Sequence, residues 1–278
     1  MLGHELLRVL GRTHEVRVTL RREQSAYADS GLFHSGNTYS GIDIRDPERL
    51  RASFQDFRPQ AVINAVGVVK QRPDAADSIS SITINALFPH QLAQLCSEYS
   101  ARLVHMSTDC VFSGDHGGYK EEDFTDAKDL YGRSKVLGEL CEDHCVTLRT
   151  SIIGRELSRR TGLLEWFLAQ QGPVQGYRKA VFSGFTTSEM ARIIERLLIR
   201  HPRVSGLYHV SSEPIAKYDL LNMIKHSLSL RTEIIPDDSV HIDRSLDSTR
   251  FRAELGYTPP TWTAMIDELA RNIATVTT

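Results

Sequence analysis

Short apolar runs alternate with segments of helical spacing through the first half of the chain. Four runs rich in β-branched residues predict strands at 15–20, 61–69, 102–107 and 146–153. Three segments between them have apolar positions three and four residues apart and predict helices at 47–57, 85–99 and 131–141. This alternation is typical of a parallel sheet built from β-α-β units. Segment 61–69 is apolar almost throughout, which predicts a strand covered by helices on both faces.

The second half of the chain has a more helical pattern. Apolar residues at helical spacing predict helices at 163–171, 188–201, 218–228 and 262–273. Two short extended pieces, 207–211 and 232–235, interrupt this pattern. We therefore predict an α/β fold whose doubly wound, Rossmann-type parallel sheet lies in residues 1–155. Residues 156–278 are expected to form a smaller, mostly helical region, with segments that return to the sheet.

Composition excludes several classes of protein. The 278 residues include 33 Lys and Arg against 35 Asp and Glu, and 41% are hydrophobic, which is typical of a folded domain. A net charge of −2 gives no basic field for nucleic acid. No apolar run is long enough to span a bilayer, and no signal-like segment follows Met1, so we expect a cytoplasmic protein.

The four cysteines form no CxxC pair, which indicates reduced thiols. Cys141, His144 and Cys145 lie close together in the sequence, but no fourth ligand is evident. We therefore predict no metal site.

A tyrosine and a lysine share one face of the helix predicted from residue 131. Tyr131 and Lys135 are four residues apart, and the strand predicted at 102–107 leads directly into Thr108 and Asp109. Ligand sites of parallel α/β sheets gather at the carboxyl ends of strands. The threonine hydroxyl is therefore expected at the substrate, with one chain crossover between it and the tyrosine.

These residue types fit the reduction of a ketone. Hydride transfer creates an alkoxide, which needs a proton donor close by. The pKa of a free tyrosine is near 10, and a neighbouring lysine ammonium lowers it and can also hold a cofactor ribose. The Thr108 hydroxyl could hydrogen-bond the carbonyl oxygen and stabilise its developing charge.

These motifs resemble the extended short-chain dehydrogenase/reductase family, and within it the branch of the dTDP-4-dehydrorhamnose reductases. The resemblance covers essentially the whole chain and rests on segments 1–6, 62–67, 107–112, 131–135, 149–151, 246–250 and 255–257. It implies an NAD(P)-binding domain in residues 1–155 and a mainly substrate-binding region in 156–278. The implied activity is NAD(P)H-dependent reduction of a nucleotide-linked 4-keto sugar, in deoxysugar or cell-surface polysaccharide biosynthesis. A homodimer is also compatible with the family.

The resemblance assigns roles residue by residue. Catalysis is assigned to Thr108, Tyr131 and Lys135. Cofactor binding is assigned, besides Tyr131 and Lys135, to Gly3, Arg21, Arg22, Asp43, Ile44, Asn64, Ala65 and Val66. Substrate binding is assigned to Thr108, Asp109 and Ile152. Arg21 and Arg22 follow a strand where a guanidinium could grip a 2′-phosphate, which favours NADP over NAD.

Two departures from the family pattern leave the sugar open. The family typically has aromatic residues where this chain has Cys110 and Ile152, both near the expected substrate.

Two other functions also remain: an epimerase or dehydratase with bound NAD, and a non-catalytic regulatory subunit like the β subunit of methionine adenosyltransferase. Dehydratases of this superfamily usually have an Asp-Glu pair after the strand-end hydroxyl. Asp109 is followed here by Cys110, which disfavours that chemistry.

The start of the chain is unusual for this family. Residues 1–7 already have the pattern of the first helix, and Gly3 matches only the last glycine of the family's phosphate-binding turn. The resemblance places a central strand before this point. We therefore expect the first strand and most of the glycine turn to be absent, and the chain to start at an internal methionine of a longer reading frame. We also expect weak dinucleotide binding and exposed strand edges.

Overall fold

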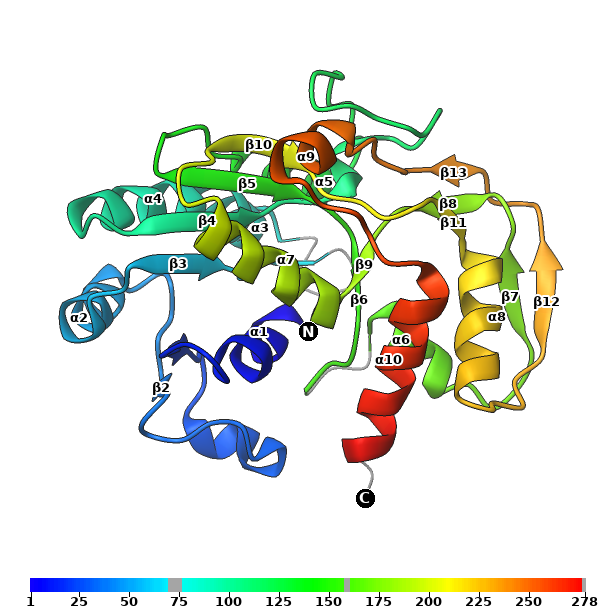
Figure 1. Ribbon diagram of the computed structural model, residues 1–278, viewed down its shortest axis with the longest axis horizontal. Helices are drawn as coiled ribbons and strands as arrows, with labels where there is room; N and C mark the ends of the chain where they lie inside the picture. The colour runs from blue at the N-terminus through cyan, green and yellow to red at the C-terminus, as the bar shows by residue number, and fades with distance from the viewer. Residues whose placement is uncertain (70–76, 158–160, 277–278) are drawn as a thin grey trace.

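A four-stranded parallel sheet forms the centre of the molecule. The computed structural model describes residues 1–69, 77–157 and 161–276. The sheet has the order β10-β5-β4-β3, and every neighbouring pair in it is parallel (Figure 1). Its strands are β3 (Ala61–Asn64), β4 (Arg102–Met106), β5 (Cys145–Arg149) and β10 (Gly206–His209). The predicted parallel α/β fold is confirmed, and β10 brings a segment of the second half into the sheet.

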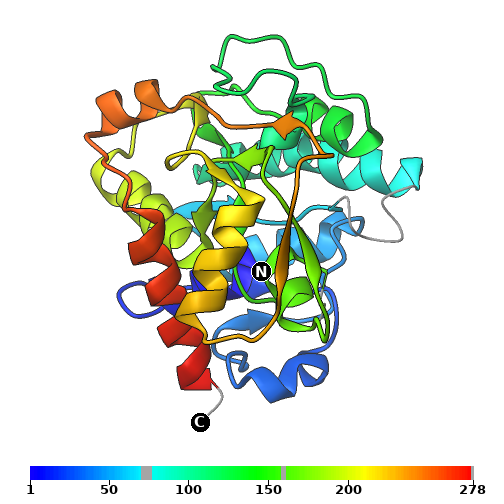
Figure 2. The ribbon, with the colours of Figure 1, turned by 90° about the vertical axis from the view of Figure 1, so that its right-hand side faces the viewer.

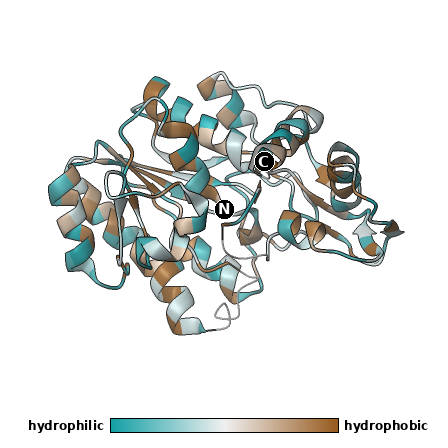
Figure 3. Cartoon of the chain, turned by 90° about the horizontal axis from the view of Figure 1, so that it is seen from below, coloured by the Kyte–Doolittle hydropathy of each residue, from teal (hydrophilic) through white to brown (hydrophobic). Residues whose placement is uncertain are grey.

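Helices cover both faces of the sheet, because successive side chains of a strand point to opposite faces. Leu103 of β4 packs with Phe54 of α2 (Pro47–Phe57) and Leu92 of α4 (Phe88–Glu98). The next residue, Val104, packs in a second core cluster with α1 (Leu2–Leu10) and α7 (Thr187–Arg200). In Figure 3 the strands in the interior are brown, while the helices alternate brown and teal as amphipathic helices do.

A second, two-stranded sheet lies outside the main one. It pairs β1 (Val18–Thr19) with β2 (Thr38–Tyr39) in parallel, and η1 (Gln24–Ser30) connects them. Within the part of the chain that the structure describes, no strand joins β1 to β3. Residues of β1 and β2 therefore form a sheet that is separate from the one that contains β3.

The second half adds short strands and helices beside the main sheet. Helices α8 (Lys217–Ser227) and α10 (Trp262–Val276) lie side by side (Figure 2). Three further small sheets are β11-β8-β13, β12-β7 and β6-β9. Their strands are β6 (Ile152–Ile153), β7 (Val174–Tyr177), β8 (Ala180–Phe182), β9 (Phe185–Thr186), β11 (Ile215–Ala216), β12 (Ile234–Asp237) and β13 (Ile242–Asp243). The remaining helices are α3 (Ser78–Ser81), η3 (Ile82–Leu87), η4 (Asp109–Val111), α5 (Leu130–Leu137), α6 (Leu163–Leu168) and α9 (Thr249–Leu255).

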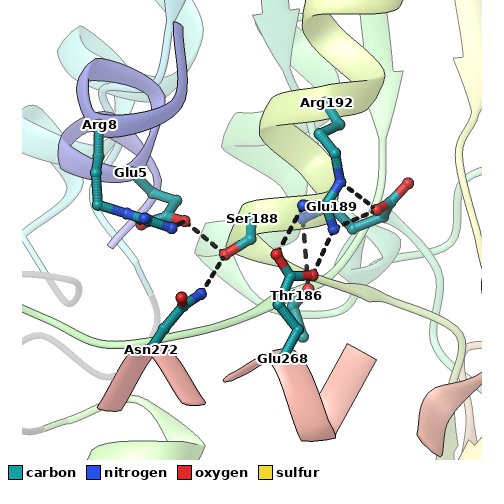
Figure 4. Close-up of polar contacts among 8 residues, drawn as sticks. All are labelled: Glu5, Arg8, Thr186, Ser188, Glu189, Arg192, Glu268 and Asn272. Carbon is teal, nitrogen blue, oxygen red and sulfur yellow. Dashed lines mark hydrogen bonds and ion pairs between the residues drawn. The ribbon is translucent and has the colours of Figure 1, made fainter. Parts of the chain in front are cut away.

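A polar network fixes α1 against α7 and α10. The Glu5 carboxylate accepts a hydrogen bond from Ser188 at 2.5 Å and pairs with Arg8 at 2.6 Å (Figure 4). Asn272 of α10 donates to the same serine hydroxyl at 3.4 Å. Arg192 joins Glu189 and Glu268, each at 2.6 Å. The first helix is thus held by buried polar contacts as well as by its leucines.

Several predicted boundaries were wrong. The strand predicted at 61–69 ends at Asn64, whose side chain accepts a hydrogen bond from the N–H of Val66 and turns the chain. The helix predicted at 85–99 begins earlier, at Ser78, and passes through a π-helical turn. The helix predicted to reach residue 141 ends at Leu137, with Gly138 as its C-cap. No described helix is long and apolar enough to cross a membrane.

Candidate active site

A cavity of about 1600 Å³ runs from the space between β1 and β3 to the carboxyl ends of β3, β4 and β5. Ten of the residues assigned from the sequence line it, namely Gly3, Ile44, Asn64, Ala65, Val66, Thr108, Asp109, Tyr131, Lys135 and Ile152. Three assigned residues, Arg21, Arg22 and Asp43, do not line it. The structure therefore brings the catalytic residues together in one cavity and leaves these three on the nearby surface.

Helix α5 brings Tyr131 and Lys135 to the cavity. Its first turn is capped by Asp129, whose carboxylate accepts a hydrogen bond from the N–H of Gly132 at 2.8 Å. A side chain at Gly132 would lie 2.3 Å from the carbonyl oxygen of Cys110. Only glycine therefore allows α5 to approach the turn that follows β4, and this approach places Tyr131 beside Thr108.

Lys135 is a buried amine in this cavity. Its side chain is 5% exposed, and its Nζ donates to the carbonyl oxygen of Met106 at 2.6 Å. Burial lowers the pKa of Lys135 to about 8, and the Glu139 carboxylate acts in the opposite direction. The amine can therefore change its charge close to neutral pH.

Tyr131 keeps its proton at neutral pH. Burial raises its pKa above the usual value of 10, while a hydrogen bond with Thr108 acts to lower it. The neighbouring Asp109 raises this pKa further, and the lowering of the Tyr131 pKa by Lys135 stays a prediction. The Tyr131 hydroxyl is therefore protonated and can donate a proton.

The strand-end residues Thr108 and Asp109 are both buried. The Thr108 hydroxyl donates to Asp109 at 3.1 Å and accepts from the N–H of Cys110 at the same distance, which caps η4. Burial raises the pKa of the Asp109 carboxyl, and Arg244 partly offsets this. Asp residues often cap such a turn through local hydrogen bonds, but here Thr108 caps η4.

Asn85 is a site residue that the sequence analysis missed. It lies in the π-helical turn η3, with its side chain 1% exposed. Its amide bonds both backbone groups of Val68, at 2.9 and 3.0 Å, and donates to Ser134 of α5 at 3.1 Å. It thereby fixes the loop after β3 to the helix that carries Tyr131 and Lys135. A π-helical turn often marks a functional site, but it has no reliable sequence signal.

A buried charged cluster behind Lys135 was also missed. Glu139 pairs with Arg149 at 2.8 Å and accepts a hydrogen bond from Ser107 at 2.7 Å. Arg149 also contacts His209 of β10 at 3.2 Å. These contacts join the ends of β4, β5 and β10, and Ser107 connects them to the cavity that it lines. Arg149 belonged to the family motif at 149–151, but its glutamate partner is ten residues away and could not be paired from sequence.

Charged residues lie on the surface beside the opposite end of the cavity, where Ile44 lines it. Asp43 pairs with Arg45 at 2.5 Å and with Arg21 at 3.6 Å. Hydrogen bonding from Arg45 holds the pKa of Asp43 well below its usual range, against the effect of burial. Arg21 remains 59% exposed. Ile44 lines the cavity beside these residues.

The residues of the cavity fit a dinucleotide. Residues 1–4 at the start of α1 line the cavity, and the first turn of a helix offers N–H groups to phosphate. Apart from its chain neighbours and the backbone of its own helix, no atom lies within 4 Å of the position where a side chain at Gly3 would begin, so the space beside this turn is open. In the described part of the chain, no group of three or more His, Cys, Asp or Glu side chains could hold a metal ion.

Comparison with known proteins identifies a family and several relatives of this chain. The sequence model of the family described as RmlD substrate binding domain matches residues 1–275. The dTDP-4-dehydrorhamnose reductase of Aggregatibacter actinomycetemcomitans is 26% identical over 192 residues, 65% of this chain and 65% of that protein. The chain thus spans slightly less than two thirds of that relative's length. Methionine adenosyltransferase 2 subunit beta of Xenopus laevis is 22% identical, over 81% of this chain and 68% of that protein.

A solved structure extends the similarity to the fold. It is described as a hypothetical dTDP-4-dehydrorhamnose reductase from Sulfolobus tokodaii, and it is 29% identical with a TM-score of 0.73. The alignment covers 91% of this chain and 90% of that chain.

Proposed function

This chain belongs to the RmlD substrate binding domain family, and from that premise we propose that it reduces a nucleotide-linked 4-keto sugar with NADPH or NADH. The observation that carries the proposal is the meeting of Thr108, Tyr131 and Lys135 in one cavity at the carboxyl ends of the strands. The name of the Aggregatibacter relative supports the same reaction class.

The proton donor in this proposal is Tyr131. A bound reduced nicotinamide supplies the hydride, and the substrate oxygen then needs a proton. The Tyr131 hydroxyl holds one, because burial keeps its pKa high. The Thr108 hydroxyl, which now donates to Asp109, can turn to the substrate oxygen and stabilise its negative charge. The Lys135 ammonium favours the phenolate that Tyr131 becomes.

The dinucleotide is proposed to lie along the cavity from α1 to α5. The first turn of α1 would face its phosphates, and Lys135 would hold a ribose. The loop Ala65–Val66 and Ile44 would contact its apolar surfaces. Asp43 and the two arginines at 21 and 22 would reach it only at the outer end.

A regulatory, non-catalytic role is the second candidate. It is favoured by the similarity to methionine adenosyltransferase 2 subunit beta, which extends over more of this chain than the similarity to the Aggregatibacter reductase. Such a role requires no proton donor, whereas Tyr131 and Lys135 are both in place. Enzymatic turnover separates the two candidates.

The test is a spectrophotometric assay of NADPH and NADH oxidation with dTDP-, GDP- and UDP-linked 4-keto sugars. We expect turnover with at least one sugar and none with Tyr131→Phe. A matched control is Tyr177→Phe, which alters a half-buried tyrosine of β7 outside the cavity. Cofactor binding without turnover on any sugar would favour the regulatory role.

A further inference from the structure

His105 is a buried histidine that the proposed mechanism does not use. It lies in β4, and its register partner in β3 is Asn64, the last residue of that strand. Register partners point to the same face of a sheet, and here His105 is 0% and Asn64 2% exposed. Nδ1 of His105 lies 3.1 Å from Nδ2 of Asn64. The two polar side chains therefore form a buried pair at the carboxyl ends of β3 and β4.

The loop after β3 determines which atom of the Asn64 carboxamide faces the histidine. The backbone N–H of Val66 donates to Oδ1 of Asn64 at 3.1 Å. A backbone N–H can only donate, so the amide oxygen must face Val66 and the NH₂ group must face His105. That NH₂ group is also a donor, so Nδ1 of His105 must accept and carry no proton. A neutral His105 therefore has its proton on Nε2.

The surroundings of His105 favour the neutral ring. Burial holds the pKa of His105 well below its ordinary value, and the charges that Lys135 of α5 and His90 of α4 can carry act in the same direction. Protonation would place a second N–H on Nδ1, directly opposite the NH₂ group of Asn64. The carboxamide would then have to turn over, and its bond to Val66 would be lost.

The other ring nitrogen shows that packing alone does not explain this histidine. Nε2 is buried and has no hydrogen-bond partner among the described residues. A buried donor without a partner destabilises a fold, and an apolar side chain of similar size would avoid that loss. The need for an acceptor opposite Asn64 does explain a histidine at this position.

We propose that His105 is a positioning residue for the dinucleotide. Its neutral ring holds the Asn64 carboxamide, which in turn holds the N–H of Val66 and with it the loop of Ala65 and Val66. Both residues of this loop line the cavity, whereas His105 does not, so the histidine acts through Asn64 and not by contact. The inference rests on the proposed function, in which this loop contacts the cofactor.

Hydrogen exchange tests the effect on the loop without any cofactor. His105→Leu removes the acceptor, so the amide of Val66 should exchange about two- to tenfold faster, as expected for one neutral hydrogen bond. The amide of Val68 is the internal control, because the Asn85 side chain holds it at 2.9 Å. His105→Asn, whose side-chain oxygen can take the place of Nδ1, should restore the parent rate. Unchanged exchange of Val66 in His105→Leu, or equal acceleration of Val66 and Val68, would overturn the proposal.

Nitrogen-15 NMR of the parent chain tests the tautomer and needs no variant. We expect the proton of the His105 ring on Nε2 and an unprotonated Nδ1 throughout the range from about pH 6 to 8, in which an ordinary histidine titrates. A protonated Nδ1 in this range would overturn the proposal, whether or not His105→Leu folds.

Cofactor titration tests the effect on binding. His105→Leu should raise the Kd of NADPH about two- to tenfold, because the loop is no longer held. In an Asn64→Ala background the same change should have no further effect, since His105 acts through Asn64. The control is His144→Leu, at a half-buried histidine that bonds the carbonyl oxygen of Ala93 and does not line the cavity. Equal effects of His105→Leu in both backgrounds would overturn the positioning role.

The two kinds of measurement separate this inference from the proposed function. A parent chain that binds neither NADPH nor NADH would refute the proposed function. The exchange rate of the Val66 amide would still decide whether His105 holds the loop, because that measurement contains no cofactor.

Discussion

The two ends of the cavity are built in different ways. One end, which we call the chemical end, contains Thr108, Tyr131 and Lys135. There Thr108 and Lys135 are at most 6% exposed, and each has hydrogen-bond partners in the surrounding chain. At the outer end, Arg21 and Asp43 lie on the surface, and their charges already offset each other. Positioned chemistry needs fixed side chains, whereas recognition of a charged ligand tolerates mobile ones. The chemical end should therefore respond strongly to single changes and the outer end weakly.

The same contrast exists between two strands of the main sheet. All five residues of β5 are buried, whereas in β3 only Asn64 is. Both strands have apolar sequences with helices on both faces. Among the residues that the structure describes, β5 pairs with β4 and β10, whereas β3 pairs with β4 alone, and this accounts for the difference. A strand's burial therefore depends on its neighbours within the sheet as much as on the helices that cover it.

The largest expected effect is at the chemical end. Tyr131→Phe removes the proposed proton donor and should reduce turnover by about 10²–10⁴. Cofactor affinity should change little, because the ring still fills its place. Steady-state turnover and cofactor titration measure the two quantities separately. Near-normal turnover would show that the buried end does not carry the chemistry.

The second prediction compares the two strands. Leu148→Ala in β5 should lower the free energy of unfolding by about 2–5 kcal/mol, because the buried side chain leaves a cavity. Ile63→Ala in β3 should cost about 1 kcal/mol, because this side chain is only half-buried. Urea unfolding of both variants gives the comparison. Equal losses would mean that β3 is as well packed as β5.

The third prediction concerns the buried amine. The Lys135 pKa is about 8 in the folded chain and 10.5 as an ordinary lysine. Between these pH values the unfolded chain binds more protons, so stability rises with pH, by up to about 1.4 kcal/mol per pH unit. Below pH 8, Lys135 is protonated in both the folded and the unfolded chain. The cost of burying its ammonium group then lowers the free energy of unfolding in full.

Lys135→Met should abolish this rise. Thermal or urea unfolding from pH 7 to 10 should show the parent gaining stability relative to the variant. The control Lys179→Met alters an exposed lysine and should run parallel to the parent. A constant difference between parent and Lys135→Met over this range would place the amine in a solvated environment.

The sequence predicted the parts of the fold that depend on local pattern. Helix α2 has the predicted bounds, because Asp46 and Pro47 start it and its apolar residues are regularly spaced. Strands β7 and β8 were missed because they are short and hold one β-branched residue each, Val174 and Val181. The division into residues 1–155 and 156–278 stays a prediction.

The candidate site shows the same limit. Tyr131 and Lys135 lie on one helix, and a motif could find them. Asn85 and Glu139 act across elements that are distant in the sequence, through a π-helical turn and a buried ion pair. Those contacts exist only after the chain has folded, so pattern alone could not indicate them.

The smallest expected effect is at the outer end. If Arg21 and Arg22 contact a 2′-phosphate, the chain should prefer NADPH to NADH. A charge-assisted hydrogen bond contributes roughly 1.5–3 kcal/mol. Because Arg21 is exposed and already 3.6 Å from Asp43, we expect the lower end, about tenfold in affinity. Replacing both arginines by alanine should remove that preference and leave the affinity for NADH unchanged, as fluorescence titration with both cofactors would measure. Arg203→Ala, at an exposed arginine between α7 and β10, is the control.

The salt concentration gives a second comparison of the two ends of the cavity, because exposed charges are screened by salt more than buried ones. At about 0.5 M KCl the NADPH preference should shrink, while the effect of Tyr131→Phe on turnover should not. Equal affinity of the parent for both cofactors at low salt would contradict the role of these arginines.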